Sequence, residues 1–147
     1  MADLELVERL AAGDHHLAVL AVARSDGSIQ ASVVSAGITT DPVDGSPAIG
    51  LVAIGNSRKL QLLRRSNQAT VVFKDGYQWA AVSGPVRLIG PDDGTELGLD
   101  VPEVIRSVYR AAGGDHEDWA EFDRVMADER RCAVFVRAER IGSNPSA

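Results

Sequence analysis

The sequence predicts an antiparallel β-barrel decorated with helices, and three observations support that fold class. Six apolar runs have the length of strands, Asp-Gly turns join four of them into hairpins, and most helical patterns come late in the chain. A doubly wound parallel sheet would need strict β–α alternation, which this chain lacks. The expected strands are residues 17–23, 28–39, 48–54, 68–73, 78–83 with its continuation 86–89, and 132–136.

The first part of the chain predicts a helix and a hairpin. Residues 2–12 carry apolar side chains at helical spacing, with polar side chains between them. The apolar run Leu17–Ala23 then leads through the turn Asp26-Gly27 into the strand expected over 28–39. We therefore expect a lid or packing helix beside an antiparallel pair of strands.

The later part predicts a second hairpin, two helices and a last strand. An Asp-Gly turn at 75–76 joins the hairpin, and the Gly-Pro pair at 84–85 cannot sit in a regular ladder, which predicts a bend or bulge. Helical spacing is found over 101–109 and again over 117–127, and the tail 142–147 is expected to be frayed. The second helix is expected to present four apolar side chains on one side: Trp119, Phe122, Val125 and Met126.

Composition narrows the class of protein. The 147 residues fit one domain, 1–147, which can bury enough surface to need no disulfide. Cys132, the only cysteine, lies in an apolar run and is expected in the core. The acidic N-terminus is unlike a targeting signal, and no apolar run approaches the roughly 20 residues that span a bilayer. We expect a cytoplasmic protein with no membrane partner, and a net charge of −6 disfavours nucleic acid.

The most unusual stretch is an apolar strand that turns into a short basic helix. After residues 49–54, Asn56 or Ser57 can cap the helix by accepting a hydrogen bond from a first-turn N–H. Arg58 and Lys59 then place two cations where the helix dipole is already positive and an acidic residue would be stabilising. Free N–H groups, dipole and cations together predict a phosphate-binding corner.

The positive charge around this corner is local. Residues 45–74 contain no Asp or Glu, although a window of this length would hold about four at the density of 21 acids in 147 residues. Arg64 and Arg65 have a simpler explanation, because cations complement a helix C-terminus and solvate its outer face. That explanation does not extend to the first turn. The basic residues of the window are Arg58, Lys59, Arg64, Arg65 and Lys74.

Three large side chains elsewhere are further candidates for ligand binding. Tyr77 and Trp79 are two residues apart, which places them on one face of a strand. They either pack in the core or flank a planar ligand by stacking, and we favour the ligand because we expect them beside the phosphate-binding corner. Arg131 heads the last strand and can reach an anion, a role for which its neighbour Arg130 competes.

Common catalytic and metal-binding patterns are missing from the sequence. His15, His16 and His116 are not spaced as metal ligands, and Cys132 has no evident base partner. The chain contains no Gly-x-Ser-x-Gly elbow, no phosphate-binding P-loop and no Gly-x-Gly-x-x-Gly pattern. We therefore predict no metal site and assign no catalytic residue.

With these residues identified, the chain resembles the pyridoxamine 5'-phosphate oxidase-like split-barrel superfamily, in particular its actinobacterial branch of flavin/deazaflavin oxidoreductases that bind coenzyme F420. The similarity runs from about Leu17 to about Arg140. It implies a mainly β (α+β) fold, a six-stranded antiparallel split β-barrel (FMN-binding split barrel) with peripheral helices, and a homodimer with the cofactor in the cleft between subunits. The motifs that carry it are Asp26-Gly27 with Gln30 and Ser32, Asp41-Pro42, Lys59 with Leu63-Arg64-Arg65, Asp75-Gly76-Tyr77-Gln78-Trp79 with Gly84, Val108-Tyr109-Arg110, Asp118-Trp119 and Asp128-Glu129-Arg130-Arg131.

The resemblance assigns the phosphate and the oligoglutamate tail of the cofactor to Ser57, Arg58 and Lys59, and the ring or tail to the aromatic pair. Ser57 departs from relatives that carry a basic residue at its position, and Val33 stands where relatives can carry a polar group near the ring. The residues expected to bind the cofactor are Val52, Ala53, Ile54, Ser57, Arg58, Lys59, Arg64, Tyr77, Trp79 and Arg131.

The activity that the resemblance implies is hydride transfer from C5 of a reduced deazaflavin to a small unsaturated acceptor. Solvent is the expected proton source, with Tyr77 a remote candidate. Three alternatives stay open: an oxidoreductase that uses FMN, a non-catalytic carrier or sensor of F420 or flavin, and a dimeric scaffold without a ligand.

Overall fold

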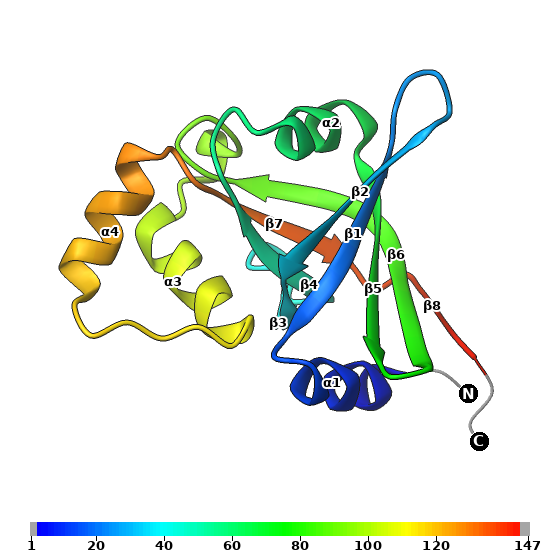
Figure 1. Ribbon diagram of the computed structural model, residues 1–147. Coiled ribbons are helices and arrows are strands. Elements are labelled where there is room, and N and C mark those ends of the chain that lie inside the picture. The colour runs from blue at the N-terminus through cyan, green and yellow to red at the C-terminus, as the bar shows by residue number, and fades with distance from the viewer. Residues whose placement is uncertain (1–2, 145–147) are drawn as a thin grey trace.

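Eight antiparallel strands form the body of the protein in the computed structural model, which describes residues 3–144 (Figure 1). Seven strands follow the order β2-β1-β5-β6-β7-β4-β3, and β8 pairs with β6 outside this path. The predicted antiparallel arrangement is confirmed, although two strands more than expected are present. The strands are β1 Leu17–Ala23, β2 Ile29–Ser35, β3 Gly37–Thr40, β4 Pro47–Ala53, β5 Gln68–Asp75, β6 Gln78–Ile89, β7 Cys132–Arg137 and β8 Arg140–Ser143.

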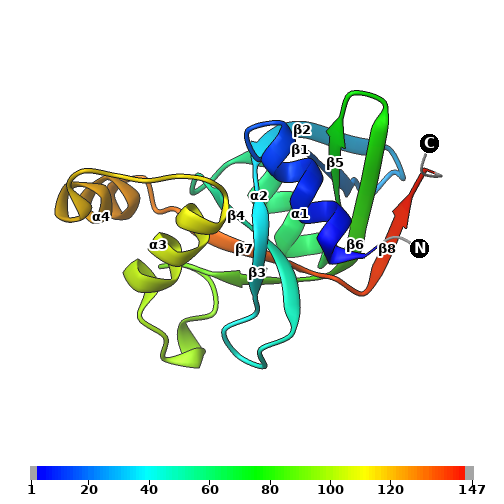
Figure 2. The ribbon, with the colours of Figure 1, turned by 90° about the horizontal axis from the view of Figure 1, so that it is seen from below.

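The helices lie around this sheet, as the sequence predicts. Helix α1 lies at one end of the strands and α2 at the opposite end, while α3 and α4 stand together on one flank (Figures 1 and 2). Within residues 3–144, no helix has the length and apolar character needed to cross a membrane. The helical segments are α1 Leu4–Gly13, α2 Arg58–Ser66, the 3-10 turn η1 Thr95–Leu97, α3 Val101–Ala111 and α4 Trp119–Asp128.

Strand β6 joins the two halves of the sheet. Its first residues pair with β5 on one edge and β8 on the other, and residues 86–89 pair with β7. Opposite residues 84–85, the chain that leads from β7 to β8 contains three residues, 137–139, so one residue is extra. Gly84 allows this close approach, because a Cβ there would lie 2.1 Å from the carbonyl oxygen of Arg137. An extra residue is thus present on the partner edge, but Gly84 and Pro85 themselves stay in regular register with Ala69 and Gln68 of β5, contrary to the prediction that they cannot sit in a ladder.

The single strand predicted over 28–39 is wrong, because the chain leaves the ladder at Ala36. The N–H of Ala36 donates to the carbonyl oxygen of His16 at 2.9 Å, and the chain then passes from β2 into β3. Gly37 lies against the end of α3, where a Cβ would be 1.8 Å from the carbonyl oxygen of Ala111. The kink carries the chain from one half of the sheet to the other.

The core has two parts, one inside the barrel and one under the flanking helices. Leu20 of β1, Val7 of α1 and Leu63 of α2 belong to the inner cluster, so the two end helices close the barrel. Phe135 of β7 and Phe122 of α4 belong to the outer cluster. Since β4 and β7 are covered on both faces, they are apolar up to the terminal Arg137 of β7, and such strands are easily recognised in a sequence.

Two local predictions differ from the structure. Val125 is 36% exposed, because α4 turns this residue to solvent while Phe122 faces the core. Gly142 and Ser143, predicted to fray, belong to β8, and the side chain of Asn144 accepts a hydrogen bond from the N–H of Trp79 at 2.9 Å. The rest of the predicted frayed tail, and the start of the predicted first helix, lie outside the described residues.

Candidate functional site

The corner between β4 and α2 is built as a helix start with an open N-terminus. Asn56 adopts a left-handed conformation with φ +64°, which turns the chain after the strand. The Ser57 hydroxyl oxygen then accepts a hydrogen bond from the N–H of Leu60 at 3.3 Å. Of the two predicted caps, Ser57 is the one used. The N–H groups of Arg58 and Lys59 have no backbone acceptor among the described residues, so they can bind an anion.

Arg58 and Lys59 flank this helix start on different sides. At about 100° per residue, Lys59 projects between the directions of the buried Leu62 and Leu63, whereas Arg58 projects toward the outer side. Lys59 is accordingly half-buried and Arg58 exposed. Neither forms an ion pair within residues 3–144, and the first turn of α2 contains no acid. Both positive charges are therefore available to a ligand.

A groove of about 380 Å³ lies between the outer side of α2 and the β1–β2 turn. Arg24 lines this groove together with Arg58 and Arg65, although the sequence analysis did not identify Arg24 as a candidate. Arg24 donates to the carbonyl oxygen of Ile29 at 3.0 Å, which holds its side chain beside the turn. We call this groove, which contains the three arginines, the arginine groove. The full lining is Arg24, Ser25, Asp26, Arg58, Gln61, Leu62 and Arg65.

One carboxylate lies in the arginine groove. Asp26 accepts hydrogen bonds from the hydroxyl and the N–H of Ser28 at 2.6 and 2.9 Å, and these bonds lower the pKa of its carboxyl below the ordinary value. The carboxylate is thus occupied in fixing the turn. With three arginines against one aspartate, the groove keeps an excess of positive charge.

Arg64, also expected at the cofactor, is engaged elsewhere. Its guanidinium donates two hydrogen bonds of 2.8 Å each to the carboxylate of Asp93, which comes from the loop after β6. The hydrogen bond with Asp93 raises the pKa of Arg64. A contact between Arg64 and a cofactor stays a prediction, and such a contact would have to compete with Asp93.

Arg131 heads β7 as predicted, and it too is paired. Its Nε donates to the Glu129 carboxylate at 2.7 Å, while Arg130 donates to Asp92 at 2.8 Å. The carbonyl oxygen of Glu129 accepts a hydrogen bond of 3.0 Å from the N–H of Gly55, which ties this segment to the corner. Arg131 therefore lies near the phosphate-binding corner, but its charge is balanced in the described part of the chain.

Tyr77 and Trp79 do not lie beside the corner within one chain, contrary to the prediction. The β5–β6 turn lies next to α1, at the end of the sheet opposite α2 (Figure 1), where Gln78 accepts a hydrogen bond from Arg9 at 3.3 Å. The eight residues of β5 separate the turn from the end of α2, roughly 25 Å of strand. Tyr77 belongs to the turn and is 95% exposed, and Trp79 is 39% exposed.

The end of β4 offers backbone beside the corner. Its residues pair with β7 along one edge as far as Ala53, whereas β3 covers the other edge only as far as Gly50. Beyond Gly50 that second edge has no strand partner in the described chain. Ile54 follows and is 48% exposed. Contact of the segment 52–54 with a cofactor stays a prediction, and the uncovered edge gives it polar backbone groups for that purpose.

Acid–base chemistry has little support in the side chains. Burial raises the pKa of the Cys132 thiol to about 12, so the thiol is protonated at neutral pH. No group of three or more His, Cys, Asp or Glu side chains suited to a metal is found within residues 3–144. The free N–H groups and unpaired cations at the start of α2 are suited to binding an anion.

Comparison with known proteins identifies the fold. No family model matches the chain. A pyridoxamine 5'-phosphate oxidase-related, FMN-binding protein from Nostoc punctiforme PCC 73102 matches at 10% identity and a TM-score of 0.63, over 97% of this chain and 84% of that one. An F420 reductase matches at 16% identity and a TM-score of 0.57, over 86% of this chain and 88% of that one. The conserved hypothetical protein Rv2991 from Mycobacterium tuberculosis matches at 18% identity and a TM-score of 0.66, over 97% of this chain and 84% of that one.

These matches confirm the predicted fold class. The chain has the α+β split-barrel fold of the pyridoxamine 5'-phosphate oxidase-like proteins, with a sheet whose two end strands, β2 and β3, are not paired with each other in the described chain. The same fold is found in an FMN-binding protein and in an F420 reductase.

Proposed function

We propose that the protein is a homodimeric oxidoreductase that binds coenzyme F420 and transfers hydride from the reduced deazaflavin to a small unsaturated organic acceptor. The observation that carries the proposal is the N-terminus of α2, where Arg58 and Lys59 have no acidic partner within residues 3–144. Two cations at the positive end of a helix are unfavourable until an anion binds. The fold, shared with an F420 reductase, supports the same reading.

The corner fits the phosphate of such a cofactor. Ser57 leaves the first two N–H groups of α2 without a backbone acceptor in the described chain, and Lys59 lies beside them on the barrel side. These donors would hold a phosphate without any metal ion. FMN and F420 both carry a phosphate, so the corner alone does not choose between them.

The arginine groove favours F420 over FMN. The phosphate of F420 continues into a lactyl-oligoglutamate tail with several carboxylates, and Arg24, Arg58 and Arg65 lie next to the corner. An exposed guanidinium–carboxylate pair contributes up to about 1 kcal/mol. Two or three such pairs would favour F420 by roughly tenfold or more. Arg64, which the sequence also suggested for the tail, is less suitable because Asp93 holds it.

The side chains of this protein would bind and orient rather than react. When bound, the reduced deazaflavin supplies the hydride. The exposed Ile54 follows the uncovered edge of β4 and offers an apolar surface, from which water is readily displaced. The groove and the first turn of α2 contain no histidine, and the two carboxylates nearby, Asp26 and Glu129, are engaged with Ser28 and Arg131. Solvent would therefore deliver the proton.

A second copy of the chain would complete the site. The outer face of the β1, β2 and β6 strands leaves Ile29, Val33 and Trp79 exposed by 56%, 66% and 39%. Apolar side chains gathered on one sheet face are typical of an interface. If that face packs on a second copy, Tyr77 and Trp79 of one chain can reach the corner of the other. In such a dimer the pair would serve the corner of the partner chain and not its own.

Two other functions remain in competition. FMN chemistry is favoured by the match to an FMN-binding protein, since any phosphate suits the corner. A non-catalytic carrier of the cofactor is favoured by the lack of an acid or base at the site, because a carrier needs neither.

Titration of the protein with F420 and with FMN at physiological salt tests the proposal. We expect F420 to bind at least about tenfold more tightly. The double variant Arg24→Ala, Arg65→Ala should lose most of that preference and keep its affinity for FMN, while Arg124→Ala, on the exposed side of α4, should change neither. Tighter binding of FMN would overturn the choice of cofactor.

Turnover separates the enzyme from the carrier. Protein loaded with reduced F420 is mixed with quinones, enones and tetrapyrroles, and oxidation is followed by absorbance. Oxidation by at least one acceptor class, faster than without protein, is the expected result. A loaded protein that oxidises with none of them is a carrier, and the enzyme proposal then fails.

A further inference from the structure

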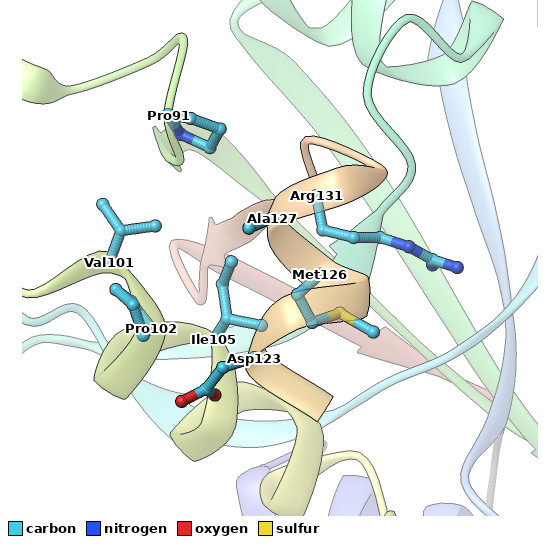
Figure 3. A pocket seen from close by; sticks show the side chains of 8 residues that line it. All are labelled: Pro91, Val101, Pro102, Ile105, Asp123, Met126, Ala127 and Arg131. Atoms are coloured by element: carbon cyan, nitrogen blue, oxygen red, sulfur yellow. The ribbon is translucent and has the colours of Figure 1, made fainter. Parts of the chain in front are cut away.

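The charged side chains in the open groove between α3 and α4 are both engaged within the chain. Figure 3 shows this groove, in which Asp123 and Arg131 lie among apolar side chains. Asp123 accepts a hydrogen bond of 2.8 Å from Arg106, and Arg131 donates one of 2.7 Å to Glu129. These charges need no ligand, whereas one polar group on β2 has no partner.

The side chain of Gln30 carries this unsatisfied acceptor. Its Oε1 atom is buried, and it is the only buried side-chain oxygen or nitrogen without a hydrogen-bond partner within residues 3–144. Buried polar atoms are almost always hydrogen-bonded, so an exception calls for an explanation. Gln30 as a whole is half-buried, so its amide lies at the boundary between the interior and the surface. A half-turn of the amide exchanges its oxygen and its nitrogen, and either end can then face a ligand.

Gln30 belongs to the inward face of β2, which is only half covered. It lies opposite the buried Val22 in the β1–β2 ladder. Ser32, two residues further along the same face, lies opposite the buried Leu20. The inward residues of β1 are at most 3% exposed, whereas Gln30 and Ser32 are half-buried. An amide and a hydroxyl on the inner face of a barrel are unfavourable unless polar groups meet them.

This face of β2 lies close to the phosphate-binding corner. β2 is an end strand of the sheet, and its Cα atoms come within 8 Å of β4 although the two strands are not paired. Beyond Gly50, β4 has no partner on one edge in the described chain, and the strand leads directly into the corner at 55–57. The inward face of β2, the uncovered edge of β4 and the start of α2 therefore adjoin one another at the open side of the barrel.

We propose that Gln30 is a specificity-determining residue that hydrogen-bonds the pyrimidine edge of the cofactor ring. This inference rests on the proposed function, which assigns the phosphate of the cofactor to the corner. The pyrimidine edge of a flavin or deazaflavin presents an N–H group, N3–H, between two carbonyl oxygens. A carboxamide can accept a hydrogen bond from N3–H and donate one to the adjacent carbonyl. The ring would thus supply the donor that the described chain does not give to Oε1.

Titration of the whole protein with FMN and with 3-methyl-FMN tests the proposal, because the added methyl group removes the N3–H donor. We expect the parent protein to bind FMN at least about fivefold more tightly than 3-methyl-FMN. Gln30→Met keeps the length of the side chain and removes the amide, so it should lose most of that preference. A preference that is missing from the parent protein, or that survives in full in the variant, refutes the role of Gln30.

The free protein and F420 provide a second measurement. Since Oε1 has no partner in the described chain, Gln30→Met should leave Tm unchanged or raise it, and it should weaken F420 binding about fivefold. Gln68→Met removes the same amide from an exposed position at the start of β5 and should keep the affinity within twofold. If Gln30→Met does not fold, Gln30→Ala takes its place. A lower Tm with unchanged F420 affinity would make the amide a structural group and overturn the proposal.

The proposed function and the role of Gln30 fail in different ways. A parent protein that binds neither F420 nor FMN contradicts the proposed function, and the role of Gln30 fails with it. Tight binding of F420 that is equal in the parent and in Gln30→Met contradicts the role of Gln30 alone. Tighter binding of FMN than of F420 overturns only the choice of cofactor, because both rings carry the same pyrimidine edge.

Discussion

Replacement of Lys59 by methionine should raise the stability of the free protein and weaken cofactor binding. Methionine keeps a long apolar stem, so the half-buried contact beside Leu62 and Leu63 is retained while the charge is lost. A cation at a helix N-terminus costs about 0.3–1 kcal/mol, and removing it should raise Tm by about 1–3 °C in a chain of 147 residues. A lost charged hydrogen bond to phosphate costs about 1.5–3 kcal/mol, or roughly 10- to 150-fold in affinity.

Urea unfolding of the free protein and titration with F420 measure the two effects. Arg124→Met is the matched control, since Arg124 is exposed on α4 and lies outside α2 and the arginine groove, and it should alter neither quantity. A Lys59→Met protein that is less stable than the parent and binds F420 with unchanged affinity would refute the reasoning. In that case the charge would be satisfied within the protein, and the phosphate would bind elsewhere.

Two further predictions concern stability. Gly37→Ala should destabilise the protein by about 2 kcal/mol or more in urea, because its Cβ would meet the carbonyl oxygen of Ala111; Gly142→Ala, with no atom within 4 Å of its Cβ, should not destabilise it. The hydrogen bond from Arg106 lowers the pKa of Asp123, so this pair stabilises the fold above the ordinary carboxyl pKa of about 3.9 and loses its effect as the pH falls toward the lowered pKa. Thermal melts of Asp123→Asn should therefore depend less on pH in the acid range, and an unchanged dependence would contradict the role of this pair.

The strands could be predicted because burial imposes a pattern on them, whereas their interruptions could not. β4 and β7 are covered on both faces and are apolar except for Arg137 at the end of β7. The break after β2 leaves only Gly37 as a sign in the run 28–39, and the close approach of Gly37 to the carbonyl oxygen of Ala111 depends on a helix far later in the chain. β8 is short and largely polar, and it is held through its pairing with β6, which the sequence does not encode as an apolar pattern.

The candidate site was predictable where it is local in sequence. The strand end, the cap and the first-turn cations of α2 are consecutive, so their arrangement follows from helix geometry alone. Arg24 was missed because it joins the groove through the β1–β2 hairpin, from more than thirty residues earlier in the chain. Tyr77 and Trp79 were misplaced for a related reason. Their distance from the corner is set by the length of β5, which runs from the end of α2 to the turn that precedes β6.

The acid-free window 45–74 shows how sequence and space differ for charge. Asp93 lies outside the window, yet the fold brings its carboxylate to 2.8 Å from Arg64. Arg58 and Lys59 receive no such partner within residues 3–144, although they belong to the same helix. The amino-acid composition of the window cannot explain why Arg64 has an acidic partner while Arg58 and Lys59 have none, because all three residues lie in the same acid-free window. Arg24 and Arg65 also lack an acidic partner within residues 3–144, but Arg58 and Lys59 differ from them because they lie at the positive end of a helix. Two cations at that end without an acid mark the place where we expect the anionic ligand.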